Sequence, residues 1–175
     1  MAYADGSGQT ILRQAFESGD FATFVGGDGM VGQALVDAVG ADVLDGMIAT
    51  KPGIPDVPGL NAFEEAMTSL ALDPKAVFAA QAYDAAFLLA LAIEENGSAS
   101  AEGLNEALRK VSSAPGTVIL PGEWEKAKKA IAAGQDINYE GASGNHEFDA
   151  NGDVPGLIVE MTVENGKFVE KGVLK

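Results

Sequence analysis

The sequence predicts an α/β fold in which a parallel sheet is covered by helices. Three observations support it: helical and extended patterns alternate up to Thr50, a mainly helical portion follows, and the C-terminal residues alternate in polarity. Alternating helices and strands are typical of parallel sheets, because the chain must return across the sheet before the next parallel strand begins. With 175 residues and 47% hydrophobic content, the chain can bury a core.

The first elements are expected before Thr50. Apolar residues recur at helical spacing from Gln9, and Gly19 stands where a left-handed residue would end that helix. A strand over 21–25, a helix over 30–39 and a strand over 46–50 should follow.

A connector is expected next, because residues 51–59 hold three prolines and two glycines. Helices are predicted over 60–71, 74–95, 100–111 and 122–133, the second of them ended by Asn96-Gly97 and the third capped by Ser100. Near the C-terminus, apolar residues alternate from Leu157 to Val163, and Asn165-Gly166 predicts a hairpin turn.

Charge and composition exclude several classes of protein. The chain has 26 acidic and 11 basic residues and a formal net charge of −15, which argues against nucleic acid as a partner. Its longest apolar stretch, 85–93, is too short to span a bilayer. The absence of cysteine removes disulfides and thiol nucleophiles.

The N-terminal residues predict a chain without a signal peptide. Residues 1–3 resemble the end of a strand whose beginning is absent, and residues 1–5 lack a basic segment followed by an apolar one. We therefore expect a chain that is either cytosolic or truncated.

Patterns that would support catalysis or metal binding are weak. His146 is the only histidine, so catalysis by a Ser–His pair has little support and we expect no enzyme and no cofactor. Residues 149–153 (DANGD), with Glu160, match part of a calcium loop, but Val154 replaces the required glycine, and we interpret the segment as a polar turn. Residues 5–10 (DGSGQT) lack the lysine of a phosphate-binding loop and are interpreted as a helix cap.

Six segments carry a family resemblance: 8–15 (GQTILRQA), 24–29 (FVGGDG), 46–52 (GMIATKP), 78–85 (FAAQAYDA), 136–144 (DINYEGASG) and 148–153 (FDANGD). The first four occur in the order and spacing of the leucine/isoleucine/valine-binding proteins, and the last two resemble the closing segment of many relatives. The resemblance implies a type I periplasmic binding fold, in which two α/β lobes hold an amino acid between them. Residues 1–51 would form the later part of the second lobe, 52–153 the later part of the first, and 154–175 strands returning to the second.

The resemblance also implies three ligand-binding residues. Asp28 matches the acidic residue that receives the ligand ammonium group, although the family often has glutamate there. Capping of the helix expected near Met30 is the alternative, and because one oxygen can accept a backbone N–H while the other faces the cleft, we expect both roles. Tyr3 matches a tyrosine of the cleft, with the end of a strand as the alternative. Phe78 matches an apolar ligand contact, and a buried core position would explain it equally well.

The function that the resemblance implies is that of a solute-binding component of an ABC importer for branched-chain or related amino acids. Its partners would be the amino acid and a membrane permease, and its location periplasmic. The alternative is a ligand-sensing regulatory domain of the same fold. Because the residues that grip the ligand carboxylate in this family belong to the absent first half, we expect the isolated chain to bind amino acids poorly. Exposed strand edges are expected to favour a homodimer or a domain swap.

Overall fold

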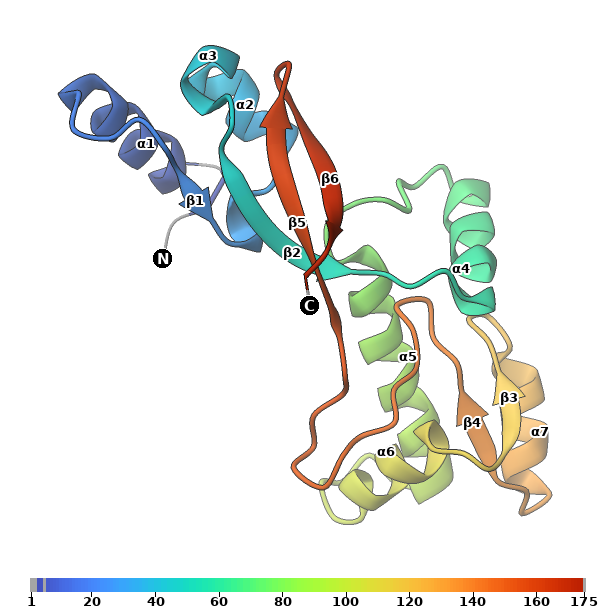
Figure 1. The fold of residues 1–175 in the computed structure, drawn as a ribbon. Coiled ribbons are helices and arrows are strands. Elements are labelled where there is room, and N and C mark those ends of the chain that lie inside the picture. Colours follow the sequence, from blue (N-terminus) through green and yellow to red (C-terminus); the bar gives the residue numbers. More distant parts are fainter. Residues whose placement is uncertain (1–2, 5, 175) are drawn as a thin grey trace. The chain divides into compact units, whose positions relative to one another are not determined.

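The computed structural model describes residues 3–4 and 6–174, which form two compact units (Figure 1). Unit 1 runs to Gly53 and resumes at Gly156, and unit 2 is Ile54–Pro155. The chain therefore passes between the units twice, and each unit has its own buried apolar residues.

Unit 1 is a mixed sheet with helices on one face. In chain order its elements are α1 (Ser7–Ser18), β1 (Val25–Gly26), the 3-10 helix η1 (Asp28–Met30), α2 (Gln33–Val39), α3 (Ala41–Leu44), β2 (Ile48–Gly53), β5 (Leu157–Glu164) and β6 (Lys167–Val173). The strand order is β1-β2-β5-β6, parallel between β1 and β2 and antiparallel elsewhere. Figure 1 shows α1, α2 and α3 on the same side of this sheet. The core between them contains Leu12, Met30, Leu35, Val36, Val39, Leu44, Met47 and Val163.

The observed ends of the helices and strands in unit 1 can be compared with those predicted from the sequence. The cap at Gly19 is confirmed, since its φ is 74° and its N–H bonds the carbonyl of Phe16. The strand expected over 21–25 is wrong, because regular pairing covers only Val25–Gly26. The helix expected over 30–39 begins later, at Gln33, because Val31 and Gly32 are extended.

Strand β2 continues into the proline-rich connector. It pairs with β1 only at Ile48 and Ala49, whereas its pairing with β5 continues to Gly53. Pro52 therefore lies where one side of the strand needs no partner, and that is where a sheet tolerates a residue without an N–H.

The C-terminal hairpin is confirmed. Asn165 and Gly166 both have left-handed backbones, with φ of 52° and 74°, as a two-residue turn between twisted strands requires. Along β5, Val159, Met161 and Val163 are buried and alternate with more exposed residues. At the opposite edge of the sheet, Val25 of β1 is 76% exposed; association through strand edges remains a prediction.

Unit 2 is mainly helical but contains two strands that the sequence did not predict. Its elements are α4 (Pro58–Ser69), α5 (Ala79–Asn96), α6 (Leu104–Ser112), β3 (Thr117–Ile119), α7 (Trp124–Ala132) and β4 (Ile137–Tyr139). The two strands pair in parallel. Each has only three residues, which is too short for polar–apolar alternation to identify a strand, and all three residues of β4 are buried, the polar Asn138 included.

Two helices of unit 2 begin later than predicted. Helix α5 begins at Ala79 rather than at Pro74, because Phe78 is left-handed with φ 64° and Asp73 accepts the N–H of Lys75 in a turn. Helix α6 begins at Leu104 after a left-handed Gly103, so Ser100 is not its cap. The predicted end of α5 is confirmed by Gly97, whose φ is 65°.

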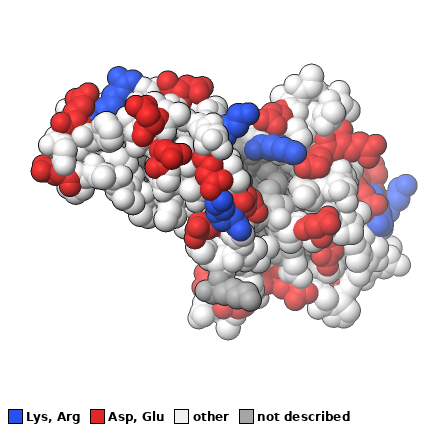
Figure 2. Space-filling view, turned by 45° about the horizontal axis from the view of Figure 1, so that its top comes forward, with Lys and Arg blue, Asp and Glu red and all other residues white. Residues whose placement is uncertain are grey.

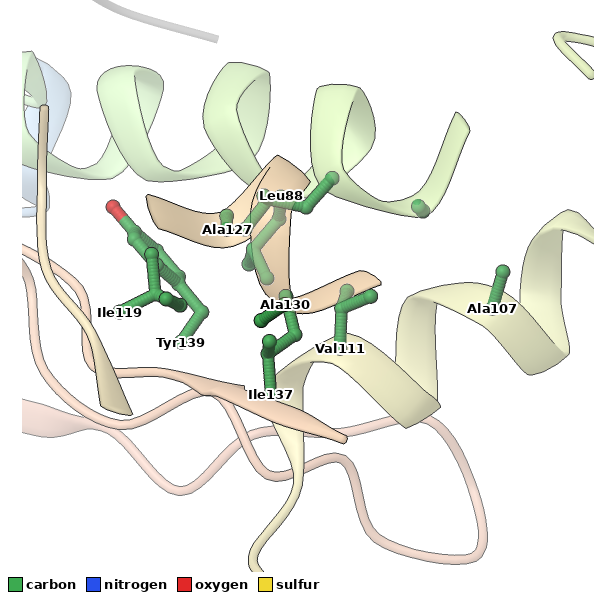
Figure 3. Packing of buried hydrophobic residues seen from close by; sticks show 10 residues of the cluster. Leu88, Ala107, Val111, Ile119, Ala127, Ala130, Ile137 and Tyr139 are labelled. Atoms are coloured by element: carbon green, nitrogen blue, oxygen red, sulfur yellow. The ribbon is translucent and has the colours of Figure 1, made fainter. Parts of the chain in front are cut away.

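The core of unit 2 lies between α5, α6, α7 and the two strands. Figure 3 shows Leu88 of α5, Ala127 of α7 and Ile119 and Tyr139 of the strands directed toward one another. The aromatic ring of Phe87 lies between Tyr83, Trp124 and Tyr139, with centroid distances of 5.7, 6.1 and 5.1 Å. Among the helices of the described residues, none combines the length and apolarity needed to cross a bilayer.

Candidate ligand-binding site

Asp28 lies at the carboxyl end of strand β1, in the first turn that follows it. The strand ends at Gly26, and the carbonyls of Gly27 and Asp28 accept the N–H groups of Met30 and Val31, both at 3.0 Å. Met30 is buried in the core of unit 1, which anchors this turn. Ligands of open α/β sheets bind outside the carboxyl ends of the strands, and Asp28 lies at such an end; its role as a ligand contact stays a prediction.

The side chain of Asp28 is exposed and only partly engaged. Its Oδ1 accepts the N–H of Gly29 at 2.6 Å, and its Oδ2 accepts no hydrogen bond from the described residues. Neither η1 nor α2 has a hydrogen bond to a capping side chain. The expectation that Asp28 caps a helix is therefore wrong, both as its only role and beside ligand contact, and Oδ2 has no hydrogen-bond donor among the described residues.

Tyr3 belongs to a backbone segment that joins the Asp28 turn. The next residue, Ala4, donates its N–H to the carbonyl of Gly29 at 2.7 Å, and the carbonyl of Tyr3 accepts the N–H of Gly8 at 3.0 Å. Gly8 permits this approach, because a Cβ there would overlap the Tyr3 carbonyl oxygen and lie 2.8 Å from the sulfur of Met30. The structure thus brings the backbones of Tyr3 and of the Asp28 turn together, and the side chain of Tyr3 is 50% exposed.

Phe78 belongs to the other unit, immediately before helix α5. Its side chain is 42% exposed, so the alternative of a buried core position is wrong. Its left-handed backbone, with φ 64°, is unusual for a bulky residue, and such strain is often found at binding sites. Its role as a ligand contact stays a prediction.

Asp84 was not predicted as a site residue from the sequence, and it is fully buried in the second turn of helix α5. Its Oδ1 accepts the Tyr139 hydroxyl at 2.6 Å and the Ala142 N–H at 2.9 Å. Its Oδ2 accepts the Ser143 N–H at 2.7 Å and the Ser143 hydroxyl at 2.6 Å. A signal was present, because Asp84 is an acidic residue within an otherwise apolar stretch of the chain.

The hydroxyl of Tyr139 acts as a donor in this cluster. Burial first, and then the hydrogen bond to Asp84, raise the pKa of Tyr139 well above its ordinary value. His146 is less closely bound, with Nε2 at 3.5 Å from both Asp84 Oδ2 and Ser143 Oγ. Because Ser143 donates to Asp84 rather than to His146, the group does not have the arrangement of a Ser–His–Asp triad.

The segment that matched part of a calcium loop is a polar turn, as predicted. Asp149 Oδ1 accepts the N–H groups of Asn151 at 2.8 Å and Asp153 at 2.9 Å. The hydrogen bonds from the backbone, that of Asp153 first, lower the pKa of Asp149. Glu160, which would complete the loop, lies on strand β5 in the other unit. Asp5 of the glycine-rich segment lies outside the described residues, and α1 begins at Ser7 with no side-chain cap.

A family model described as "Receptor family ligand binding region" matches residues 6–163. The chain belongs to this family. The matched range of the receptor family includes Asp28, Phe78 and Asp84, whereas Tyr3 precedes it. Acidic side chains are spread over the face of this receptor-family chain that Figure 2 shows, with basic ones at fewer places.

Two curated receptors are similar to part of the chain. The leucine-, isoleucine-, valine-, threonine- and alanine-binding protein of Pseudomonas aeruginosa is 37% identical over 100 residues, 57% of this chain and 26% of that protein. The chemotactic signal transduction system substrate-binding protein BasB of Halobacterium salinarum is 33% identical over 94 residues, 53% of this chain and 23% of that protein. The matches therefore span about a quarter of these relatives' length.

Solved structures of solute-binding receptors share the fold. The leucine-binding protein LivK of Thermotoga maritima has a TM-score of 0.68 and 26% identity and matches 99% of this chain and 43% of its own. The branched-chain amino acid transporter substrate-binding protein LivJ of Streptococcus pneumoniae, solved with isoleucine, has a TM-score of 0.63 and 23% identity, with the same coverage. The receptor-family chain thus has part of a type I periplasmic binding fold, as the sequence predicted.

Proposed function

We propose that this chain is part of a receptor that captures a branched-chain or related amino acid for an ABC importer. The observation that carries the proposal is the turn of Asp28, which presents a partly free carboxylate at the carboxyl end of a strand in a receptor-family chain. The names of the similar proteins support the choice of ligand, since they include leucine-, isoleucine- and valine-binding receptors.

The chemistry of Asp28 suits an ammonium group. In a cleft with little water, a carboxylate and an ammonium group form a charge-assisted hydrogen bond, which is roughly twice as strong as a neutral one. Oδ1 would remain bonded to the N–H of Gly29, and Oδ2 would receive the ligand. Because aspartate is one methylene shorter than the glutamate that relatives often have, the ligand would lie nearer the backbone or bind through a water molecule.

Two aromatic residues would contact the rest of the ligand. Tyr3 would offer its ring to an apolar side chain and its hydroxyl to a polar atom. Phe78 would contribute a second apolar surface from the start of α5. The groups that hold the ligand carboxylate would come from a part of the receptor that this chain does not contain, so the proposal concerns the complete receptor.

The partner that receives the ligand is the part of the proposal on which the relatives differ. A receptor of an importer would deliver its amino acid to a membrane permease from the periplasmic side. The Halobacterium relative is named for a chemotactic signal transduction system, so a receptor of this family can also report its ligand to a signalling partner. Ligand capture is common to both functions.

The test uses the complete receptor. A thermal-shift screen of the common amino acids identifies the best ligand, and calorimetry then measures its Kd for the wild type and for Asp28→Ala. Loss of a hydrogen bond to a charged group costs about 1.5–3 kcal/mol, so we expect the Kd to rise by about 10- to 100-fold.

A matched control is Asp20→Asn, which changes an exposed aspartate of the same unit and should leave the Kd unchanged. If Asp28→Ala bound the best ligand as tightly as this control does, Asp28 would not be the ammonium site. If no amino acid stabilised the wild type, the proposed ligand class would be wrong.

A further inference from the structure

Asp84 lies at the centre of a buried cluster that the proposed ligand site does not use. We propose that Asp84 is a positioning residue: it clamps the loop 141–146 against helix α5, and this loop in turn holds the segment 54–57 through which the chain enters unit 2. The proposal goes beyond ligand binding and does not depend on the identity of the ligand.

The clamp joins segments that are far apart in the chain. All four hydrogen bonds to Asp84 come from Tyr139, Ala142 and Ser143, which follow it by 55 to 59 residues. The carboxylate of Asp84 is fully buried, so water does not compete for these donors. A single side chain in the second turn of α5 therefore holds both the last residue of strand β4 and the loop that follows it.

The loop packs against the clamp without room for a side chain. A Cβ on Gly141 would lie 2.6 Å from Asp84 Oδ2 and 2.5 Å from Cε1 of His146. A Cβ on Gly59, in the first turn of α4, would overlap the carbonyl oxygen of Gly141. The backbone of the loop is thus in direct contact with α5 on one side and with the beginning of α4 on the other.

The same loop supports the first passage, which enters unit 2 at Ile54. Gly144 has φ 120°, and a Cβ there would lie 3.0 Å from Cγ of Pro55. Pro55 and Pro58 limit the backbone of this segment further, because each proline ring holds φ near −65°. The chain between unit 1 and α4 is therefore short, stiff and packed against the clamped loop.

The second passage is held immediately after the loop. Glu147 accepts the N–H of Ala114 at 3.3 Å, and Arg109 of α6 donates to the carbonyl of Asp149 at 2.6 Å. Beyond the turn of 149–153, Gly156 begins the return to unit 1, and a Cβ there would meet no atom within 4 Å. The loop 141–146 thus packs against the first passage at Pro55, and loss of the hydrogen bonds to Asp84 should loosen that passage.

The test measures the distribution of distances between the two units in this chain, without ligand. The natural sequence has no cysteine, so Glu17→Cys on α1 and Lys129→Cys on α7 give two specific sites for spin labels on exposed positions. Asp84→Asn has the same shape but places an NH₂ group among the donors. We expect a broader distance distribution by pulsed electron resonance and about tenfold faster amide exchange at Ala142 and Ser143.

A control and a second variant keep the outcome decisive. Asp136→Asn changes a carboxylate of unit 2 that approaches only the exposed Lys110, at 3.7 Å, and should leave both readouts unchanged. If Asp84→Asn does not fold, Ser143→Ala removes one donor and should change both readouts in the same direction. A lowered Tm with an unchanged distance distribution would show that Asp84 only stabilises unit 2 and would overturn the proposal.

Discussion

Replacing Tyr139 by phenylalanine tests how much the buried cluster of unit 2 contributes to stability. The ring of Tyr139 is fully buried, and the substitution removes only the hydroxyl that donates to Asp84 Oδ1 at 2.6 Å. That oxygen would keep one donor, the N–H of Ala142. Apolar burial should hardly change, so the effect reports one hydrogen bond to a buried carboxylate.

The expected cost follows from the type of bond. A hydrogen bond to a charged group contributes about 1.5–3 kcal/mol, and we expect about 2 kcal/mol for Tyr139→Phe. For a chain of this size each kcal/mol lowers the Tm by about 2–4 °C, so the Tm should fall by about 4–8 °C. Urea unfolding followed by circular dichroism measures the free energy directly.

Tyr83→Phe is the matched control. Both tyrosine rings contact Phe87, but the Tyr83 hydroxyl accepts the N–H of Gly122, an exposed residue, at 2.8 Å. Water can replace that acceptor, so the control should lose about 0.5 kcal/mol. If Tyr139→Phe were no more destabilising than Tyr83→Phe, the hydrogen bond to Asp84 would not be a major source of stability.

The hydroxyl of Tyr139 should also make the free energy of unfolding depend on pH in the alkaline range. The pKa of Tyr139 is higher in the folded chain than its ordinary value near 10, so its contribution is complete below about pH 10 and is lost as the pH rises further. In the Tyr83→Phe background, Tyr139 is the only one of the two cluster tyrosines that titrates. Adding Tyr139→Phe to this background should therefore cost less stability above pH 10 than below it, and a cost that does not change with pH would contradict the assigned donor role.

Two further predictions concern local turns. Gly166→Ala should lower the free energy of unfolding, measured in urea, by about 1–2 kcal/mol, because the φ of Gly166, 74°, is left-handed. The control Gly27→Ala should be nearly neutral, because Gly27 has φ −88° and a Cβ there would meet no atom within 4 Å; equal effects of the two variants would refute the assigned turn. Asp149 has a lowered pKa when folded, so its contribution should be present above about pH 4 and be lost as the pH falls below that value. An NMR titration should show the amide of Asp153 moving with this step in the wild type and not in Asp149→Asn, and a pH-independent amide would contradict the turn.

The sequence was most informative where structure depends on a few neighbouring residues. The ends of α1 and α5 were predicted from Gly19 and Gly97, because a left-handed residue is easy only for glycine. The hairpin was predicted from Asn165-Gly166 for the same reason. Helix starts were predicted less well, since Phe78 takes a left-handed backbone that no local propensity favours.

The candidate ligand site was predictable in part. Only the family resemblance indicated Asp28 as a ligand contact, and the structure adds that its carboxylate does not cap a helix. The link between Tyr3–Ala4 and Gly29 could not be read from the sequence, because the residues are about 25 positions apart and their bond is made by the backbone.

By itself the sequence determined the fold class, the positions of most helices and the C-terminal hairpin, because apolar periodicity and turn residues act over short ranges. Tertiary structure alone decided that the three-residue strands β3 and β4 pair and that Asp84 is buried rather than solvated. Both outcomes require groups brought together from distant parts of the chain. Three-residue strands and a carboxylate with no donors nearby in the sequence can be interpreted only when packing excludes water and supplies the partners.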